Sequence, residues 1–112
     1  MLLFAARDTW ANVIYVAEKF GEPMLADKAE SYLHSEAVQL CDEGCAYVVC
    51  GMLGAMHDLE RICVRMTTLI YRIARVIRQY SRMDKEVRTY FSEHPDVLML
   101  LREADRCRKQ PR

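Results

Sequence analysis

Apolar residues recur at three- and four-residue steps along most of the chain, and this spacing places them on one face of an α-helix. Sustained alternation of apolar and polar residues, the pattern of half-buried strands, is not found. Only four glycines and three prolines interrupt the pattern. The sequence therefore predicts an all-α fold of five to six helices, either an irregular helical bundle or an α-solenoid fragment.

Three helices are predicted in the first half of the chain. The first covers residues 2–20 and ends at Gly21. A short helix over residues 23–33 follows, because a proline at its first position loses no intrahelical hydrogen bond. Ser35 is a suitable N-cap for a third helix over residues 36–56.

Three further helices are predicted in the second half. Asp58 can cap a helix over residues 59–82, and the short link before it favours an antiparallel hairpin with the preceding helix. Asp84 can cap a short helix over residues 85–91. A proline and an aspartate then open a last helix over residues 95–108.

The stretch GCAYVVCGMLGAM, residues 44–56, contains no charged side chain. Its thirteen residues are too few for a membrane span, which needs about 20 apolar residues. Gly44, Gly51 and Gly54 fall near one stripe of the predicted third helix. Since each glycine inside a helix costs about 1 kcal/mol relative to alanine, we expect a neighbouring helix to approach closely along this stripe.

A chain of 112 residues can bury one core, and 52% hydrophobic residues is typical of a globular domain. The first predicted helix begins without a capping residue. We therefore expect a single all-α domain, residues 1–112, that is a fragment of a longer chain.

The chain has an odd number of cysteines, five. Its first eight residues, MLLFAARD, have no basic start and only a short apolar run, unlike a secretory signal peptide. Free thiols and a cytoplasmic or nuclear location are the expectation.

Metal binding and catalysis receive little support from the sequence. Cys41 and Cys45, four residues apart, would share a helix face and could join His34 or His57 around zinc, but no second cysteine pair follows. Burial in the core is the favoured role of Cys41, Cys45 and Cys63, and His57 and His94 are expected as solvated surface side chains. No nucleophile elbow or phosphate-binding glycine loop occurs. We expect no metal, no cofactor and no enzymatic activity.

Charge is distributed unevenly although the net charge is zero. Residues 1–60 contain ten acidic and three basic side chains, a net charge of −7, whereas residues 61–112 contain six acidic and thirteen basic ones, a net charge of +7. Two interpretations remain open. Acidic and basic helices could pack side by side and neutralise each other, or the basic half could face an acidic partner.

The predicted helix over residues 59–82 is divided into two faces. One face is apolar, and the other carries arginines, with no acidic residue between Glu60 and Asp84. The planar guanidinium pairs with carboxylates through two parallel hydrogen bonds. The apolar face comprises Ile62, Met66, Leu69, Ile70, Ile73, Ile77 and Tyr80, and the arginine face comprises Arg61, Arg65, Arg72, Arg75, Arg78 and Arg82, with Tyr71 among them. The candidate binding residues are Tyr71, Arg72, Arg75, Arg78 and Arg82.

An acidic segment of a partner protein is the favoured ligand of this face. A solvated face that adjoining helices neutralise is the plain alternative. A nucleic-acid-binding module is a further alternative, although zero net charge argues against it. Membrane-surface binding is disfavoured because the apolar face is needed for the core.

The segment Thr68–Ala104, TLIYRIARVIRQYSRMDKEVRTYFSEHPDVLMLLREA, resembles a unit of armadillo or HEAT-type helical repeats. It is also similar to helical scaffold regions of very large ubiquitin-specific proteases. The resemblance implies a scaffold that binds proteins through a superhelical surface, without peptidase activity. A solenoid fragment exposes apolar ends, so self-association is expected if the chain is one.

Overall fold

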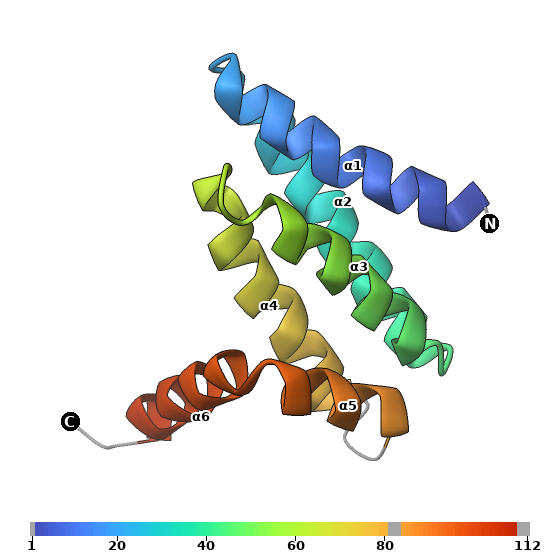
Figure 1. Cartoon of the computed structure of the whole chain (residues 1–112), viewed down its shortest axis with the longest axis vertical. Helices are drawn as coiled ribbons and strands as arrows, with labels where there is room; N and C mark the ends of the chain where they lie inside the picture. The colour runs from blue at the N-terminus through green and yellow to red at the C-terminus, as the bar shows by residue number, and fades with distance from the viewer. Residues whose placement is uncertain (1, 81–83, 110–112) are drawn as a thin grey trace.

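The fold is built from α-helices throughout. A computed structural model describes residues 2–80 and 84–109, and this part of the chain contains six helices and no strand (Figure 1). The all-α prediction is therefore confirmed. The helices are α1 (Leu2–Lys19), α2 (Pro23–Asp42), α3 (Ala46–Leu59), α4 (Val64–Tyr80), α5 (Lys85–Glu93) and α6 (Pro95–Lys109).

Helix α1 ends where the sequence predicts. Gly21 adopts a positive φ of 71°, a conformation that glycine enters without a steric penalty. The amide of Glu22 then donates to the carbonyl oxygen of Ala17 at 2.7 Å and closes the helix end. The chain reverses over these residues, and α2 begins at Pro23.

Helix α2 corrects the predicted break at Ser35. A single helix of 20 residues replaces the short helix over 23–33 and the start of the one over 36–56. The reason is the apolar stripe, which continues without interruption on both sides of Ser35 and is buried along its length. Ser35 is exposed in the interior of the helix and caps nothing. The buried residues of this stripe are Ala26, Ala29, Leu33, Ala37, Leu40 and Cys41.

The actual break falls at Gly44, which has a φ of 81°. The amide of Gly44 donates to the carbonyl oxygen of Cys41 at 3.1 Å, and that of Cys45 donates to Leu40 at 2.8 Å. Helix α3 begins at Ala46. A Cβ added at Gly54 would meet no atom within 4 Å. The expected close approach of a helix is therefore wrong at Gly44, which makes a turn, and at Gly54, which faces open space.

Asp58 is also not the N-cap that the sequence predicts. It lies in the last turn of α3, and α4 begins only at Val64, after a turn over residues 60–63. The short link still places α3 beside α4, as expected for a hairpin. Ile62 precedes α4 and is exposed, as is Tyr80 at its end, so neither belongs to the apolar face.

The C-terminal helices begin as predicted. The carboxylate of Asp84 accepts hydrogen bonds from the amides of Glu86 at 2.9 Å and Val87 at 3.4 Å. This is the geometry of an N-cap. Helix α5 continues to Glu93, and α6 begins at Pro95.

The first four helices pack as two successive pairs, whereas α5 and α6 follow one another nearly end to end across the end of α4 (Figure 1). Helix α1 packs on α2, and α3 packs on α4. Across the pairs, α1 contacts α3 and α3 contacts α5, while α2 contacts α4 and α4 contacts α6. No helix in the described part of the chain has both the length and the hydropathy of a membrane span.

The hydrophobic core lies between the packed helices, with α4 at its centre. The apolar face of α4 is buried from Met66 to Ile77, as the sequence predicts. Cys41 and Cys63 are buried in agreement with the expectation, whereas Cys45 is half-buried. The largest fully buried side chains include Ile14, Leu33, Leu53, Met56, Met66, Leu69, Ile70, Ile73, Ile77 and Leu101.

Candidate functional site

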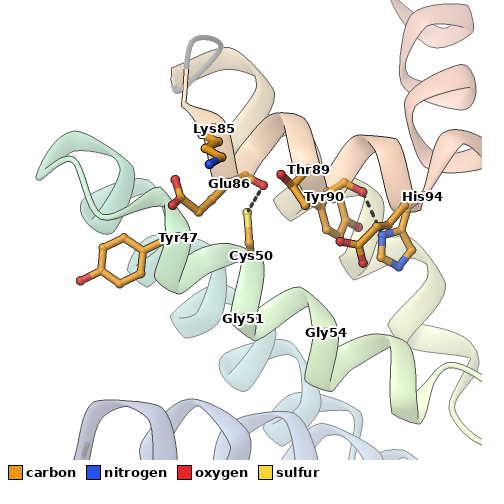
Figure 2. A pocket seen from close by; sticks show the side chains of 10 residues that line it. Tyr47, Cys50, Gly51, Gly54, Lys85, Glu86, Thr89, Tyr90 and His94 are labelled. Carbon is orange, nitrogen blue, oxygen red and sulfur yellow. Dashed lines mark hydrogen bonds between the residues drawn. The ribbon is translucent and has the colours of Figure 1, made fainter.

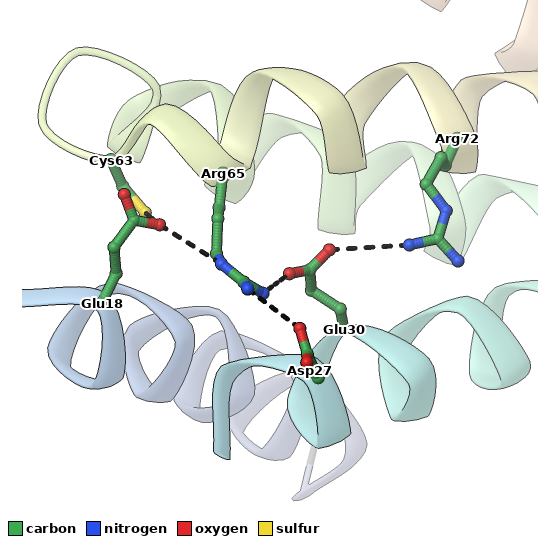
Figure 3. Close-up of polar contacts among 6 residues, drawn as sticks. All are labelled: Glu18, Asp27, Glu30, Cys63, Arg65 and Arg72. Atoms are coloured by element: carbon green, nitrogen blue, oxygen red, sulfur yellow. Dashed lines mark hydrogen bonds and ion pairs between the residues drawn. The ribbon is translucent and has the colours of Figure 1, made fainter. Parts of the chain in front are cut away.

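The arginine face of α4 is divided between two neighbouring helices. At its N-terminal end, Arg65 reaches three carboxylates of α1 and α2 (Figure 3). Its Nε lies 3.5 Å from Glu18, its Nη2 lies 2.9 Å from Asp27, and its Nη1 contacts Glu30. The hydrogen bond with Asp27 is the main cause that raises the pKa of Arg65 above its usual value.

Arg72 shares one of these carboxylates. Its Nη1 lies 3.5 Å from Glu30, whose side chain is only 12% exposed and bridges Arg72 and Arg65 (Figure 3). Burial and the charge of Arg72 lower the pKa of His34, which is also on α2. At this end of α4, acidic and basic helices therefore pack side by side, as one interpretation of the charge distribution anticipated.

Arg75 and Arg78 turn towards α6 instead. Arg75 lies 3.6 Å from a carboxylate oxygen of Asp105, and Arg78 contacts the other oxygen of the same group. Both guanidinium groups are shielded, with 31% and 19% of their side-chain surfaces exposed. Two arginines thus share one carboxylate, which leaves an excess of positive charge beside α6.

Tyr71 does not extend this surface. Tyr71 is half-buried against the hydrophobic core, and burial raises the pKa of its hydroxyl, with further contributions from Asp96 and Glu60. Arg82 lies outside the described residues. Of the four candidates that the structure describes, Arg72 therefore faces α2, Arg75 and Arg78 face α6, and Tyr71 packs against the core.

A basic pocket lies where α4, α5 and α6 meet, and among the candidate residues that the structure describes, Arg78 alone lines it. The cavity measures about 540 Å³. We call it the arginine pocket. Its polar lining residues are Arg78, Arg88, Ser92, Arg102 and Asp105, and its apolar wall comprises Val87, Phe91 and Leu98.

Helical spacing explains how these side chains converge. Arg88 and Ser92 lie four residues apart on α5, and Leu98, Arg102 and Asp105 follow at steps of four and three on α6. Each set therefore occupies one face of its helix. Arg88 and Arg102 are not among the candidate residues, because all of those candidates come from one predicted helix. Their spacing was visible, but the pairing of these faces with α4 was not.

The arginine pocket keeps two guanidinium groups available. Neither Arg88 nor Arg102 takes part in an ion pair within residues 2–80 and 84–109, and both are exposed. Among the described residues, the lining contains three arginines and one carboxylate, that of Asp105, so positive charge is in excess by two. Such a pocket can accept carboxylates through charge-assisted hydrogen bonds.

A second cavity of about 370 Å³ lies between α3 and α5 (Figure 2). We call it the glycine pocket because Gly51 and Gly54 leave part of its wall without side chains. The thiol of Cys50 lies in it, 3.7 Å from the carbonyl oxygen of Glu86. Burial, assisted by the charge of Asp84, raises the pKa of Cys50 to about 12. The thiol is therefore protonated at neutral pH and is a poor nucleophile.

A polar cluster lies beside the glycine pocket. His57 accepts or donates a hydrogen bond at each ring nitrogen, with Glu60 at 3.1 Å and the hydroxyl of Tyr90 at 3.0 Å. Burial is the main cause that raises the pKa of Tyr90. The ring of His94 stacks on both His57 and Tyr90. Both histidines are half-buried, so their expected place on the solvated surface is wrong.

This cluster joins α3 to α5 through a hydrogen bond and stacked rings. Tyr90 is buried, and its raised pKa keeps the hydroxyl protonated. Among the described residues, no three His, Cys, Asp or Glu side chains gather so that they could hold a metal ion. Cys41 lies on α2 and Cys45 precedes α3, so the two thiols do not share a helix face.

No protein-family model matches the chain, and neither does a curated protein or a solved structure. The resemblance to armadillo and HEAT-type repeats, and to helical regions of ubiquitin-specific proteases, therefore depends on the sequence pattern alone.

Proposed function

We propose that this chain is a non-catalytic protein-interaction module whose arginine pocket binds an acidic segment of a partner protein. The observation that carries the proposal is the pair of unengaged guanidinium groups, Arg88 and Arg102, beside an apolar wall. A flexible segment could present two carboxylates to these arginines and one apolar side chain to Phe91 and Leu98.

The placement of Arg78 supports this role. Arg75 and Arg78 hold Asp105, which fixes the guanidinium of Arg78 at the edge of the pocket. A positioned charge loses less conformational entropy on binding than a mobile one. Each charge-assisted hydrogen bond with an incoming carboxylate contributes about 1.5–3 kcal/mol.

The stacking of helix pairs supports a scaffold of the α-solenoid type. The pair α3–α4 contacts α1–α2 on one side and α5 and α6 on the other, as expected of repeats that contact only their neighbours. The arginine pocket would then lie where the second pair meets α5 and α6. In this proposed role the chain binds a partner without a cofactor and without catalysis.

Peptide binding tests the proposal. A fluorescein-labelled peptide with two Glu residues beside one Leu is titrated with the chain, and fluorescence anisotropy is measured. The wild type should bind this peptide, and the Arg88→Gln/Arg102→Gln variant should bind at least about tenfold more weakly, equivalent to about 1.4 kcal/mol. A matched variant, Lys28→Gln/Arg61→Gln, loses two exposed charges away from the pocket and should bind like the wild type.

Two results would contradict the proposal. The first is equal affinity of the wild type and the pocket variant for the acidic peptide. The second is stronger binding of a single-stranded oligonucleotide than of the peptide, with the steep salt dependence that phosphate contacts produce. That second outcome would favour the nucleic-acid alternative. The same peptide with Gln in place of Glu controls for purely apolar binding.

A further inference from the structure

An acidic turn on this same chain has the chemistry that the arginine pocket requires. Asp42 and Glu43 follow one another at the end of α2, directly before the reversal at Gly44. We call these two residues the acidic turn. The sequence contains no lysine or arginine between Lys28 and Arg61, so no basic side chain of the adjoining segments lies near it in sequence.

The charges of the acidic turn are not paired with any basic side chain in the described part of the chain. Neither Asp42 nor Glu43 takes part in an ion pair among residues 2–80 and 84–109. Glu43 accepts one hydrogen bond, from the side-chain amide of Gln39 at 3.2 Å, and both carboxylates are exposed. By contrast, the acidic side chains that face α4, including Glu18, are engaged with its arginines.

The turn also projects from the molecule. Figure 1 shows the connection between α2 and α3 at the edge of the ribbon, beyond the helices that it joins. The arginine pocket lies elsewhere, among α4, α5 and α6. The acidic turn of one molecule can therefore contact the arginine pocket of another, because their charges are opposite.

We propose that the arginine pocket binds the acidic turn of a second copy of this chain. This inference rests on the proposed function and names the acidic segment. The two adjacent carboxylates of Asp42 and Glu43 match the two unengaged guanidinium groups of Arg88 and Arg102. The cavity of about 540 Å³ has room for two short acidic side chains.

The contact joins different surfaces of the two copies. Such a heterologous contact leaves a free turn at one end of the dimer and a free pocket at the other, so it continues into a ring or an open chain. The contact joins the acidic half of the chain, residues 1–60 with a net charge of −7, to the basic half, residues 61–112 with +7. Part of this charge is already paired within the molecule, through Arg65 and Arg72. Opposite net charges on the two halves favour head-to-tail encounter over contacts between like surfaces.

Neutral variants of each surface test the contact. The pocket variant is Arg88→Gln/Arg102→Gln, and the turn variant is Asp42→Asn/Glu43→Gln. Circular dichroism first establishes that both are folded. Sedimentation velocity over a wide concentration range at low salt should show association of the wild type and monomers for each variant alone. A control, Glu22→Gln/Asp58→Asn, loses two exposed carboxylates elsewhere and should associate like the wild type.

Mixing the two variants gives the decisive result. The pocket variant retains its turn, and the turn variant retains its pocket, so one contact forms between them. The mixture should contain a heterodimer that does not grow further. Monomers in the mixture would overturn the inference, as would a wild type that stays monomeric. Self-association of either variant alone would point to a symmetric interface and would overturn it as well.

Peptide titration separates this inference from the proposed function. The turn variant has an intact pocket and should bind the acidic peptide like the wild type. If it binds the peptide while the wild type remains monomeric, the acidic segment belongs to another protein, and only the further inference fails. If it neither binds the peptide nor forms the mixed dimer, both proposals fail.

Discussion

The imidazole rings of His57 and His94 lie face to face, with centroids 4.3 Å apart and an interplanar angle of 12°. His57 belongs to α3, and His94 lies at the joint between α5 and α6. Tyr90 completes the contact through its hydrogen bond with His57 at 3.0 Å and through its ring, which stacks on His94. The last two helices, which form much of the arginine pocket, are therefore held to α3 by this polar cluster.

Removal of the Tyr90 hydroxyl should loosen that connection. Tyr90→Phe deletes the partner of His57 Nε2 and leaves a half-buried nitrogen without it. We expect a loss of about 1–2 kcal/mol in the free energy of unfolding, the range for a lost hydrogen bond with an unsatisfied group. Urea denaturation followed by circular dichroism measures the change. Tyr47→Phe is the matched control, because Tyr47 is exposed, and it should change stability by less than about 0.5 kcal/mol.

Loss of the Glu30 charge should destabilise the packing of α2 on α4. This carboxylate is 12% exposed and contacts both Arg65 and Arg72. Glu30→Gln keeps the shape but removes the charge, so we expect a loss of about 1–3 kcal/mol. Glu22→Gln, at an exposed position, should be nearly neutral. Equal urea midpoints for the two variants would show that the Glu30 contacts contribute nothing to stability.

The sequence allowed the helical class, the cap at Asp84 and the buried stripe of α4 to be predicted, because these depend on local spacing. The sequence did not allow the end of α2 to be predicted. Ser35 is a good cap in isolation, but burial of the surrounding apolar stripe outweighs its preference. The positive φ at Gly44 then terminates α2.

The arginine pocket could not be predicted from the sequence. Arg78 was identified because arginines recur along one face of its helix, whereas Arg88 and Arg102 belong to two other helices. Their convergence depends on tertiary packing, which no local pattern contains. The carboxylates that engage Arg65 and Arg75 were likewise unassigned, because Glu30 and Asp105 are distant in sequence.

The thiol of Cys50 should react slowly although it lines an open pocket. Its pKa of about 12 leaves a thiolate fraction of about one in ten thousand at pH 8, whereas an ordinary cysteine thiol is roughly one-quarter ionised. Alkylation by iodoacetamide, followed by mass spectrometry, should therefore modify the exposed Cys107 first. The rate at Cys50 should rise about tenfold per pH unit. Equal rates for the two thiols at pH 8 in the folded chain would contradict the assigned pKa; equal rates in denaturant are the expected control.

His34 should make the fold less stable in mild acid. Burial, together with the charge of Arg72, lowers its pKa in the folded state, so the unfolded chain binds the proton more readily. Stability therefore rises with pH through this window, and it is lost as pH falls below the unfolded pKa of about 6.5. His34→Gln should reduce this dependence. Urea midpoints of the two chains, compared between about pH 5 and 7.5, measure the difference; parallel curves would exclude a contribution from His34.

Two glycines should respond in opposite directions to the same substitution. Gly54 lies inside α3, and an added Cβ would meet no atom within 4 Å. Gly54→Ala should therefore stabilise the chain by about 1 kcal/mol, the difference in helix propensity. Gly44 has an equally open surrounding but a φ of 81°, which L side chains rarely adopt. Gly44→Ala should destabilise the chain by about 1–2 kcal/mol. Thermal denaturation of both variants measures these changes, and a destabilised Gly54→Ala variant would mean that a neighbour occupies the glycine pocket wall.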